Sequence, residues 1–457
     1  MMNQVQESYL KSFESFQRSA SQKGQEWLNP IRQSAFSHFS ELGFPTLKDE
    51  DWKFTNVAPI AKTSFQLPQD GDIRVAPEEV TTFTFPGLAC SRLVFINGRY
   101  SQELSSLVNL PEGVKVMNLD QAHKKERDLL EGHLTRYASF EKDAFLALNT
   151  TFMEDGSVVH IPRGKILANP IHLLYLSTPD RTPFITHPRN LIVMEENSEA
   201  VILETHDSLR EGVYFTNGVT ELLIGENSVM SHYLFELESR SAYNVSTLRV
   251  EQGLNSRFTS HSILQGGALV RNNIHPVLSG EGSECLINHL FLSNENQHLD
   301  NYMRVEHASP HCNSRQIYKG ILAGKSRGVF HGRIIVHPGA QKTDAKQTNR
   351  NILMDEALID TKPQLEIYAD DVKCTHGATI GQLDENALFY LRARGIPEEL
   401  AKVVLLFAFA NEVLDRMKVE PVRRHLETLV HQWMPKGSFM ESQNRESFKL
   451  YPQEVFG

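Results

Sequence analysis

Short runs of apolar residues, separated by Gly, Asn and Ser, fill the middle of the chain from about residue 153 to residue 383. Segments such as Ala200–Leu203 and Val229–Leu234 are too short for helices and are bounded by turn residues, as strands are. Asn and Gly tolerate the left-handed backbone that tight corners require. A corner dipeptide recurs every 27 to 31 residues, at Asn197-Ser198, Asn227-Ser228, Asn255-Ser256, Gly282-Ser283 and Asn313-Ser314.

A period near 30 residues is typical of one supersecondary unit per repeat, and such repeats stack into solenoids. No helix-length segment separates the strands, which argues against alternating βαβ units. We therefore predict a mainly β protein whose core, over residues 153–383, is a β-helix. The pattern by itself leaves a β-sandwich as the alternative.

Residues 1–152 have a mixed and mostly helical pattern. Tyr9, Phe13 and Phe16 recur at helical spacing, which predicts an amphipathic helix within residues 1–20 rather than a signal peptide. After a proline turn, Thr46 and Asp49 are typical of the start of a helix. The pattern also predicts a β-hairpin at Leu93–Ile96 with Asn97-Gly98 as its turn, and a helix over Asp143–Phe152.

Residues 384–457 return to a helical pattern. Asp384 begins a helix that Gly395 ends, Pro397 lies in the first turn of a second helix that continues to about Met417, and a third covers Pro421–Met434. The second helix is apolar nearly all round from residue 401 to 414, so we expect it to be buried in its own domain or against a partner. We therefore divide the chain into domains at 1–152, 153–383 and 384–457, with a polar tail after residue 434.

The composition narrows the class of protein. Of 457 residues, 40% are hydrophobic and 22% are charged, which is ordinary for a soluble globular protein. The net charge of −10 argues against wholesale binding of nucleic acid. The longest apolar run, Val403–Ala410, is too short to span a bilayer. Four cysteines scattered from Cys90 to Cys374 make no disulfide framework, so we expect a cytoplasmic protein.

The segment Asp371–Gly381 carries the most informative candidate chemistry. Cys374 and His376 are two residues apart in an extended pattern, so their side chains point to the same face of a strand. A thiol and an imidazole together suit a soft or borderline metal, or a sulfur-transfer site. Two ligands do not complete a four-coordinate site, so the others would come from elsewhere in the fold or from another chain. A buried thiol beside a turn histidine is the purely structural alternative.

Other candidate residues favour structural roles. His331 and His337 have Gly and Pro between them, which favours β-turn caps over a metal pair. Cys285 and Cys312 are 27 residues apart, and we interpret them as core thiols stacked on adjacent coils of the solenoid. Gly266-Gly267 is interpreted as a coil corner rather than a nucleotide-binding loop.

One charged patch and one missing motif complete the list of candidates. Asp344, Lys346 and Arg350 predict either a solvated face with weak ion pairs or part of a partner interface. No Gly-x4-Gly-Lys-Ser/Thr sequence occurs, so we do not expect this chain to hydrolyse ATP.

Taken together and in order, several blocks resemble the SufB/SufD family of iron–sulfur cluster scaffolds, and within it the D-subunit branch. The resemblance covers essentially the whole chain. This chain has only four cysteines, whereas B subunits of the family typically have more, and this supports the D-subunit branch. The blocks are Lys48–Thr55, Asp143–Asn149, Asp155–Gly164 and, most specific, the run from His331 to Gly395 with Asp344–Met354, Pro363–Ile367 and the Cys374/His376 segment.

The resemblance implies a fold, partners and a site. It implies a right-handed parallel β-helix with helical ends, pairing with a homologous SufB subunit, and engagement of the SufC ATPase through the helices from 384 to about 434. Cys374 and His376 match interface residues of the family, with His376 the better ligand candidate for a transient iron–sulfur cluster shared with the partner. The resemblance also implies a non-catalytic scaffold role and associates flavin with the assembled complex; it leaves open a homodimer when SufB is absent.

Two other classes of function serve as alternatives. The first is a β-helix enzyme acting on carbohydrate, which would require paired carboxylates in a groove, and no such pair stands out in the sequence. The second is a single-chain metalloenzyme centred on His331, His337 and His376. We expect no membrane or nucleic-acid partner for this chain.

Overall fold

The computed structural model describes residues 12–18, 20, 25–68 and 75–434. The chain divides into two compact units: one comprises Met1–Thr84 and Ala89–Ile380, and the other comprises Phe85–Leu88 and Gly381–Gly457. No described helix is both long and apolar enough to cross a membrane. Tyr9, in the helix predicted for residues 1–20, lies outside the described residues, while Phe13 and Phe16 are buried in a helical segment.

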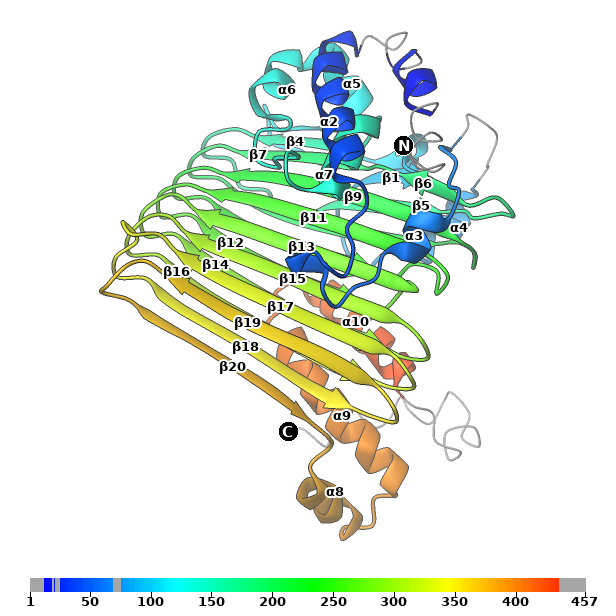
Figure 1. Ribbon diagram of the computed structural model, residues 1–457, viewed down its shortest axis with the longest axis vertical. Helices are drawn as coiled ribbons and strands as arrows, with labels where there is room; N and C mark the ends of the chain where they lie inside the picture. Colours follow the sequence, from blue (N-terminus) through cyan, green and yellow to red (C-terminus); the bar gives the residue numbers. More distant parts are fainter. Residues whose placement is uncertain (1–11, 19, 21–24, 69–74, 435–457) are drawn as a thin grey trace. The chain divides into compact units, whose positions relative to one another are not determined.

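The first unit is built on two long sheets whose strands alternate along the chain (Figure 1). The sheet that we call sheet B contains, in order, β2 (Arg99–Ser106), β1 (Ser91–Ile96), β5 (Ile171–Ser177), β8 (Glu199–Ser208), β10 (Val229–Glu236), β12 (Arg257–Leu264), β14 (Glu284–Ser293), β16 (Asn313–Leu322), β18 (Asp344–Leu353) and β20 (Lys373–Gly381). Sheet A contains β19 (Leu358–Ile367), β17 (Arg327–Val336), β15 (His298–His307), β13 (Leu269–Leu278), β11 (Tyr243–Gln252), β9 (Tyr214–Ile224), β7 (Arg189–Met194), β4 (Ser157–Ile161) and β3 (Lys115–Asn118), with β6 (Phe184–Thr186) beside β9.

From β8 onward, each strand pairs in parallel with the strand two places further along the chain, so each coil contributes one strand to each sheet. This topology confirms the parallel β-helix and excludes the β-sandwich. The inward faces of both sheets are closely packed, and a cluster of apolar side chains runs between them from Leu93 to Phe330. Burial of this apolar surface contributes to the stability of the unit.

The corners that the repeat predicted are present. Asn197, Asn227 and Asn255 all have positive φ, and their side chains form a ladder in which Asn227 Nδ2 donates to Asn197 Oδ1 (3.3 Å) and Asn255 Nδ2 donates to Asn227 Oδ1 (3.4 Å). Gly282 continues the series at φ 70°. The fifth corner was predicted wrongly: His311 adopts φ 58°, and Asn313 instead begins β16.

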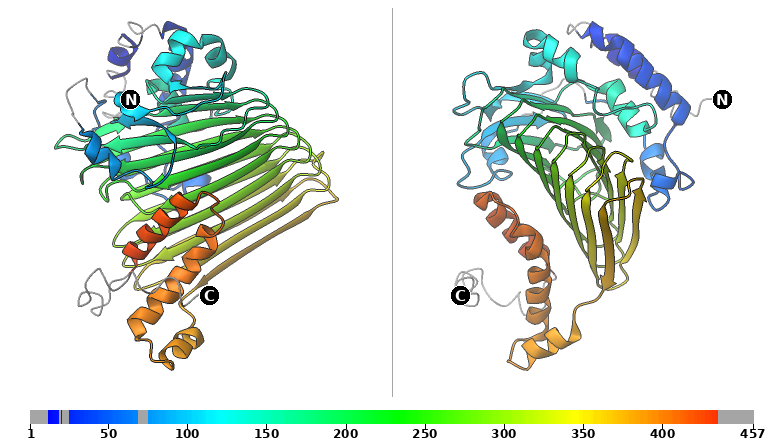
Figure 2. Two further views of the ribbon diagram at one scale, coloured as in Figure 1. Left: turned by 180° about the vertical axis from the view of Figure 1, so that it is seen from behind. Right: turned by 90° about the vertical axis from the view of Figure 1, so that its left-hand side faces the viewer.

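Helices cover one face of the solenoid at its β7–β9 end, where α2 and α7 lie together in both views (Figures 1 and 2). The helix predicted over Asp143–Phe152 is confirmed as α7 (Ala144–Phe152), with the Asp143 carboxylate capping the N–H groups of Phe145 and Leu146. The other helices of this region are α2 (Asn29–Leu42), α3 (Ala58–Lys62), α4 (Pro77–Thr81), α5 (Leu119–Lys125), α6 (Arg127–His133) and the 3₁₀ turns η1 (Glu26–Leu28) and η2 (Glu50–Trp52).

Two local predictions in this region had different outcomes. The hairpin is confirmed: β1 and β2 are antiparallel neighbours joined at Asn97 (φ 49°) and Gly98 (φ 77°). The helix expected after Thr46 is wrong as an α-helix. The Asp49 carboxylate accepts bonds from the N–H and the hydroxyl of Thr46, which closes a tight turn, and only the 3₁₀ turn η2 follows.

The second unit contains the three helices that the sequence predicted: α8 (Glu385–Arg392), α9 (Glu398–Leu414) and α10 (Glu420–Trp433). Asp384 caps α8, and Gly395 adopts φ 85° after it. Helix α9 buries Ala401, Leu406 and Ala410, and α10 packs against it through its apolar face. The predicted polar tail after residue 434 lies outside the described residues.

Candidate functional site

Strand β20 is the last strand of sheet B, and β19 is the last strand of sheet A, so the solenoid ends in two sheet edges. Lys373 N donates to Thr343 O (2.8 Å). An equivalent bond begins the parallel pairing in earlier coils, where Glu284 N donates to Ser256 O (2.9 Å). Because Glu284 pairs with Arg257 in that coil, the equivalent register pairs Lys373 with Asp344. Cys374 therefore follows Ala345, and His376 follows Gln347.

This register places both candidate ligands in inward-facing columns. Cys374 extends the column Phe258–Cys285–Ser314–Ala345, and His376 extends the column Ser260–Ile287–Gln316–Gln347. All earlier members of both columns are buried. The prediction that Cys374 and His376 share one face of a strand is therefore consistent with the pairing of β20.

The two side chains differ in exposure because the solenoid ends at this coil. Cys374 is half-buried and packs against an apolar cluster that includes Ile334, Val336 and Ala345. His376 is exposed, since no further coil covers its position. Burial raises the pKa of the Cys374 thiol, and the nearby carboxylate of Asp344 adds to the increase. The thiol is therefore protonated at neutral pH until a metal or a cation binds beside it.

The backbone of β20 also presents unpaired polar groups. In parallel strands, the N–H and C=O of one residue point to the same side, and successive residues alternate. Because Lys373 N bonds to β18, the N–H and C=O groups of Cys374, His376, Ala378 and Ile380 face away from β18. Such a row of donors and acceptors is a template for an added strand.

Apolar side chains accompany these edges. In earlier coils the side chains alternate between buried and partly exposed, as in β18, whereas nearly every residue of β20 is exposed. Large apolar residues are therefore left in solvent around the last coil: Leu358 (63% exposed), Ile367, Tyr368 and Ile380. Exposed apolar groups next to open backbone edges are characteristic of a surface that binds another chain.

Cys374 and His376 together could offer two ligands at most. Among the described residues, no group of three or more His, Cys, Asp or Glu side chains is arranged to hold a metal ion. The three histidines of the metalloenzyme hypothesis do not share partners: His331 Nε2 lies 2.7 Å from Gln364 Oε1, and His337 Nε2 lies 3.1 Å from Glu306 Oε2. The expected role as a β-turn cap is wrong for His331, which lies within β17 and is paired with Tyr302, and it agrees with His337, whose C=O accepts the N–H of Ala340 (2.9 Å) in the turn after β17.

The predicted stacking of Cys285 and Cys312 is wrong in register. Cys285 pairs with Ser314, while the Cys312 thiol lies 3.3 Å from the hydroxyl of Ser283 in the corner column. The reason is that Cys312 occupies the position of the corner serines, two residues before the position that pairs with Cys285. Gly267 adopts φ 74° at a corner, which confirms the interpretation of Gly266-Gly267.

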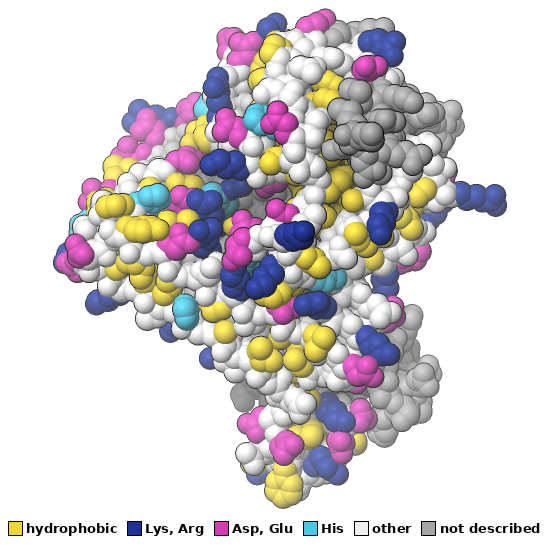
Figure 3. Space-filling view, in the orientation of Figure 1, with side chains coloured by type: hydrophobic (Ala, Val, Ile, Leu, Met, Phe, Trp, Pro, Cys, Tyr) yellow, Lys and Arg dark blue, Asp and Glu magenta, His cyan; other side chains and the backbone are white. Residues whose placement is uncertain are grey.

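The charged patch predicted from Asp344, Lys346 and Arg350 lies on β18, next to β20. Asp344 pairs with Arg315 (2.7 Å), and Lys346 is exposed. Elsewhere, Figure 3 shows Lys and Arg side chains intermixed with Asp and Glu on the face in view. Ion pairs in sheet A include Arg327 with Asp360 (2.6 Å). The exposed pairs are individually weak.

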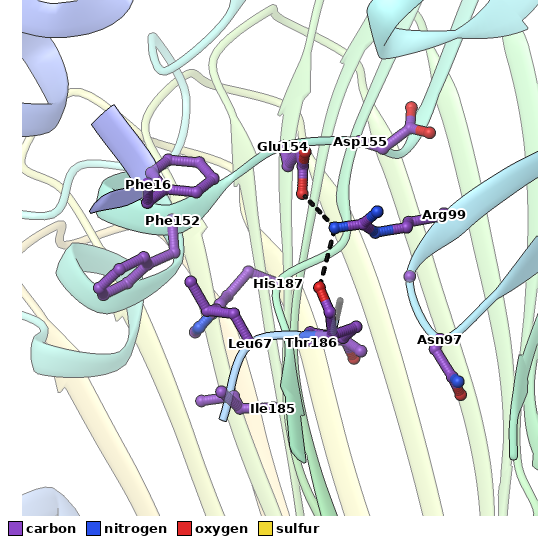
Figure 4. A pocket seen from close by; sticks show the side chains of 12 residues that line it. Phe16, Leu67, Asn97, Arg99, Phe152, Glu154, Asp155, Ile185, Thr186 and His187 are labelled. Carbon is purple, nitrogen blue, oxygen red and sulfur yellow. Dashed lines mark hydrogen bonds and ion pairs between the residues drawn. The ribbon is translucent and has the colours of Figure 1, made fainter. Parts of the chain in front are cut away.

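A small pocket lies at the opposite end of the sheet order, near the β1–β2 turn (Figure 4). Arg99 Nη2 donates to Pro68 O (2.8 Å) and lies 3.6 Å from Glu154 Oε2 across its mouth. Its volume is about 30 Å³, which is room for roughly one water molecule. We assign no ligand to this pocket.

Sequence reasoning missed two exposed aromatic residues in the second unit. Phe389 is 74% exposed and Tyr390 is 55% exposed, both on α8, and the Arg394 guanidinium stacks over the Tyr390 ring at 3.3 Å. Two adjacent aromatic residues in a short polar helix were the available signal. Aromatic and arginine side chains are the groups that most often anchor protein interfaces.

Comparisons with known proteins give one consistent result. The model "SUF system FeS cluster assembly, SufBD core domain" matches residues 176–409, and "SufBD protein N-terminal region" matches residues 3–173. An iron–sulfur cluster assembly SufBD family protein of Synechocystis is 33% identical over 87% of this chain and 89% of its own length. The iron–sulfur cluster assembly protein SufD of Escherichia coli is 32% identical over 90% of this chain and 94% of its own, and SufD of Bacillus subtilis is 24% identical over 93% and 97%.

Proposed function

The chain belongs to the SufBD family of iron–sulfur cluster assembly proteins, and from this premise we propose that it is the D-type scaffold subunit of a Suf complex. In this proposal it pairs with a SufB-type subunit, engages a SufC-type ATPase and catalyses no reaction itself. Its domains are those given above, 1–152, 153–383 and 384–457, with the last one docking the ATPase. We place it in the cytoplasm, where its four unpaired cysteines would stay reduced.

We propose that pairing occurs at the last coil of the solenoid. The edges of β19 and β20 offer unpaired backbone groups to a strand of the partner, and Leu358, Ile367 and Tyr368 offer apolar surface. The SufB-type subunit is a homologue, so it would present a similar coil end. The same edges would support a homodimer, which the resemblance leaves open when that partner is absent.

At this junction, Cys374 and His376 would supply part of the coordination of a transient cluster, which is the product being assembled. Iron in such clusters usually takes thiolate ligands, with histidine as an occasional substitute. The remaining ligands would come from the partner. The observation that carries this proposal is that a thiol and an imidazole share the inward face of an exposed edge strand.

The ligand role is tested with His376→Ala in the complex with the SufB-type and SufC-type subunits. We expect cluster formation to fall about tenfold or more, as it does when a metal site loses a ligand or its immediate support. Formation is followed by the visible absorbance of the cluster and by iron content. Thr375→Ala is the matched control, because Thr375 is exposed on the same strand and points to the opposite face.

If His376→Ala and Thr375→Ala assemble clusters at the same rate, the ligand role of His376 is wrong. If both variants fail to pair with the partner, the effect is on the interface rather than on the ligands. Co-purification of each variant complex therefore precedes the measurement. Binding of flavin to the assembled complex stays a prediction, tested by the flavin absorbance of the same samples.

We propose that the second unit docks the ATPase and that Phe389 is a main contact. Replacing Phe389 with alanine should weaken ATPase binding by about 2 kcal/mol, roughly thirtyfold in Kd, because a buried aromatic anchor loses its contact area. Titration calorimetry with the SufC-type subunit measures the change. Glu385→Gln, exposed on the same helix, should leave the Kd within about twofold. An unchanged Kd for Phe389→Ala would place the docking surface elsewhere.

An ATPase held at this unit and at its equivalent in the partner could open the paired solenoid ends by rigid-body motion. Opening would separate the two halves of the ligand set and release the cluster. In that arrangement the chain itself needs no catalytic residue: it holds two ligands, an edge for pairing and a docking surface for the nucleotide-driven subunit.

A further inference from the structure

Five ionisable side chains are buried together inside the solenoid, distant in the sheet order from β20. Glu204 and His206 come from β8, His232 and Glu236 come from β10, and Glu238 lies two residues beyond the end of β10. Each is no more than 5% exposed. Charged groups are rarely buried in this way unless they are paired or hydrogen-bonded.

Glu204 holds the two imidazoles. Its Oε1 lies 3.0 Å from His206 Nε2, and its Oε2 lies 3.2 Å from His232 Nε2. The same carboxylate also accepts bonds from Thr220 Oγ1 (3.0 Å) and Asn190 Nδ2 (3.3 Å). Both oxygens of Glu204 therefore have donors, which stabilises its ionised form.

No described imidazole is hydrogen-bonded to Glu236 or Glu238, although the charge of His206 acts on both. Asn244 Nδ2 donates to Glu236 Oε2 and to Glu238 Oε2, both at 2.7 Å, so the two carboxyl groups are close neighbours. Their other oxygens accept from the hydroxyls of Ser246 (3.0 Å) and Thr216 (2.6 Å). All four contacts are with neutral donors, and none offsets a second negative charge.

The hydrogen-bond partners decide where the proton lies. Both oxygens of Glu204 are bonded to imidazoles, whereas Glu236 and Glu238 share one neutral amide donor, and no described imidazole is bonded to either. Two neighbouring carboxylates that are both buried cannot both remain ionised at neutral pH, as in other buried carboxyl pairs. We propose that Glu236 and Glu238 share one proton at neutral pH, forming a buried proton-binding site that holds coils β8 to β11 together and weakens them when it deprotonates.

The groups that face this site from other elements support the assignment. Tyr175 of β5 stacks on His206 with ring centroids 4.8 Å apart, and Ser239 N donates to the hydroxyl of Tyr214 of β9. Burial raises the pKa of both phenols well above their usual value, so they stay neutral. On β8 itself, burial raises the pKa of Asp207 to about 7, and the charge of Glu238 adds to the increase.

The pKa directions within the cluster agree with the geometry. Burial raises the pKa of Glu236 to about 8 and also raises that of Glu238. Against the effect of burial, the charges of Glu236 and Glu204 raise the pKa of His206 to about 9. Against burial, the hydrogen bonds from His206 and His232 hold the pKa of Glu204 well below its usual value.

The sign of the pH dependence follows from these directions. A group whose pKa is raised in the folded state binds its proton more tightly there than in the unfolded chain. Its contribution to stability is complete below the unfolded pKa and is lost as the pH rises through the folded pKa. As the pH rises from about 6 to about 9, the stabilising contributions of Glu236 and His206 are lost, so the solenoid becomes less stable. Glu204 acts oppositely and contributes only to the loss of stability in acid.

The test compares thermal unfolding of the full-length chain at pH 6 and pH 9, followed by circular dichroism of the strands. The midpoint of the wild-type protein should fall by about 5 °C or more over this range. Glu236→Gln keeps the shape and removes the titration, so its midpoint should fall by less than half as much. Glu281→Gln, an exposed control, should follow the wild-type profile. Parallel profiles for wild type and Glu236→Gln would overturn the proposal.

A second measurement applies even if Glu236→Gln fails to fold. Infrared difference spectra of the wild-type protein between pH 6 and pH 10 should show the carbonyl band of a protonated carboxylic acid at neutral pH and its loss in alkali. Glu238→Gln should reduce this band. Its absence from the wild-type spectrum at neutral pH would show that both carboxyl groups are ionised and would refute the shared proton. Neither measurement depends on cluster assembly or on a partner.

Discussion

Replacing Ala378 with proline is expected to weaken pairing with a SufB-type subunit strongly while leaving the solenoid folded. The register of β20 directs the N–H of Ala378 away from β18, so proline would remove a donor only from the open edge. The ring also fills the space that a neighbouring strand would occupy. We expect pairing to weaken by about 2–3 kcal/mol, roughly 30- to 100-fold in Kd, as measured by co-purification and by sedimentation of the mixed subunits.

The matched control is Ala378→Ser, which keeps the N–H at the same edge position and should pair normally. Circular dichroism and thermal unfolding of Ala378→Pro check that the rest of the fold is intact, because proline is tolerated where the N–H faces solvent. Normal pairing by a folded Ala378→Pro variant would show that the partner does not add a strand to β20. The interface would then have to involve another surface.

Substituting Glu221 with alanine is expected to be strongly destabilising. Its carboxylate is fully buried and accepts two bonds from Arg189, at 2.6 Å and 3.0 Å. It also accepts the backbone N–H groups of Thr135, Tyr137 and Ala138, at 2.8, 2.9 and 3.0 Å. Removing it leaves a buried guanidinium without its counter-ion and three N–H groups without acceptors. We expect a loss of about 3–5 kcal/mol in the free energy of unfolding.

Urea denaturation followed by circular dichroism measures this loss. Glu221→Gln keeps the volume and one acceptor oxygen, so its loss should be smaller than that of alanine. Glu226→Ala, exposed two residues beyond the end of the same strand, should change stability by no more than about 0.5 kcal/mol. A loss below about 1 kcal/mol for Glu221→Ala would show that Arg189 finds other partners, such as Asn149 and Thr150, which already contact it.

Where sequence reasoning succeeded, local chemistry was sufficient. Asn197, Asn227 and Asn255 mark corners because their side chains tolerate positive φ, and Asn97-Gly98 forms a hairpin turn for the same reason. Where it failed, a neighbouring contact decided the outcome. The hydrogen bonds that Thr46 donates to the Asp49 carboxylate form a turn in place of a helix. The fifth corner falls at His311, a residue that the repeat of Asn and Gly did not mark.

The same contrast between local pattern and neighbouring contacts applies to the candidate site. The two-residue period of a strand was enough to place Cys374 and His376 on one face of an extended segment. The period could not show whether that face is buried or exposed. In every earlier coil the equivalent inward columns, such as Ser260–Ile287–Gln316–Gln347, have the same period and are buried. The exposure of His376 depends on β20 being the last strand of its sheet.

The sequence by itself determined the repeat, the three C-terminal helices and the spacing of the thiol and the imidazole, because these depend on backbone preferences and on periodicity along the chain. The strand pattern left a β-sandwich open, and the parallel solenoid was implied by the family resemblance. Only the tertiary structure decided which strands are edges, which apolar residues remain in solvent, and that five acids and imidazoles meet inside the coils. Those properties arise from neighbours distant in sequence, whose register is fixed only when the coils stack.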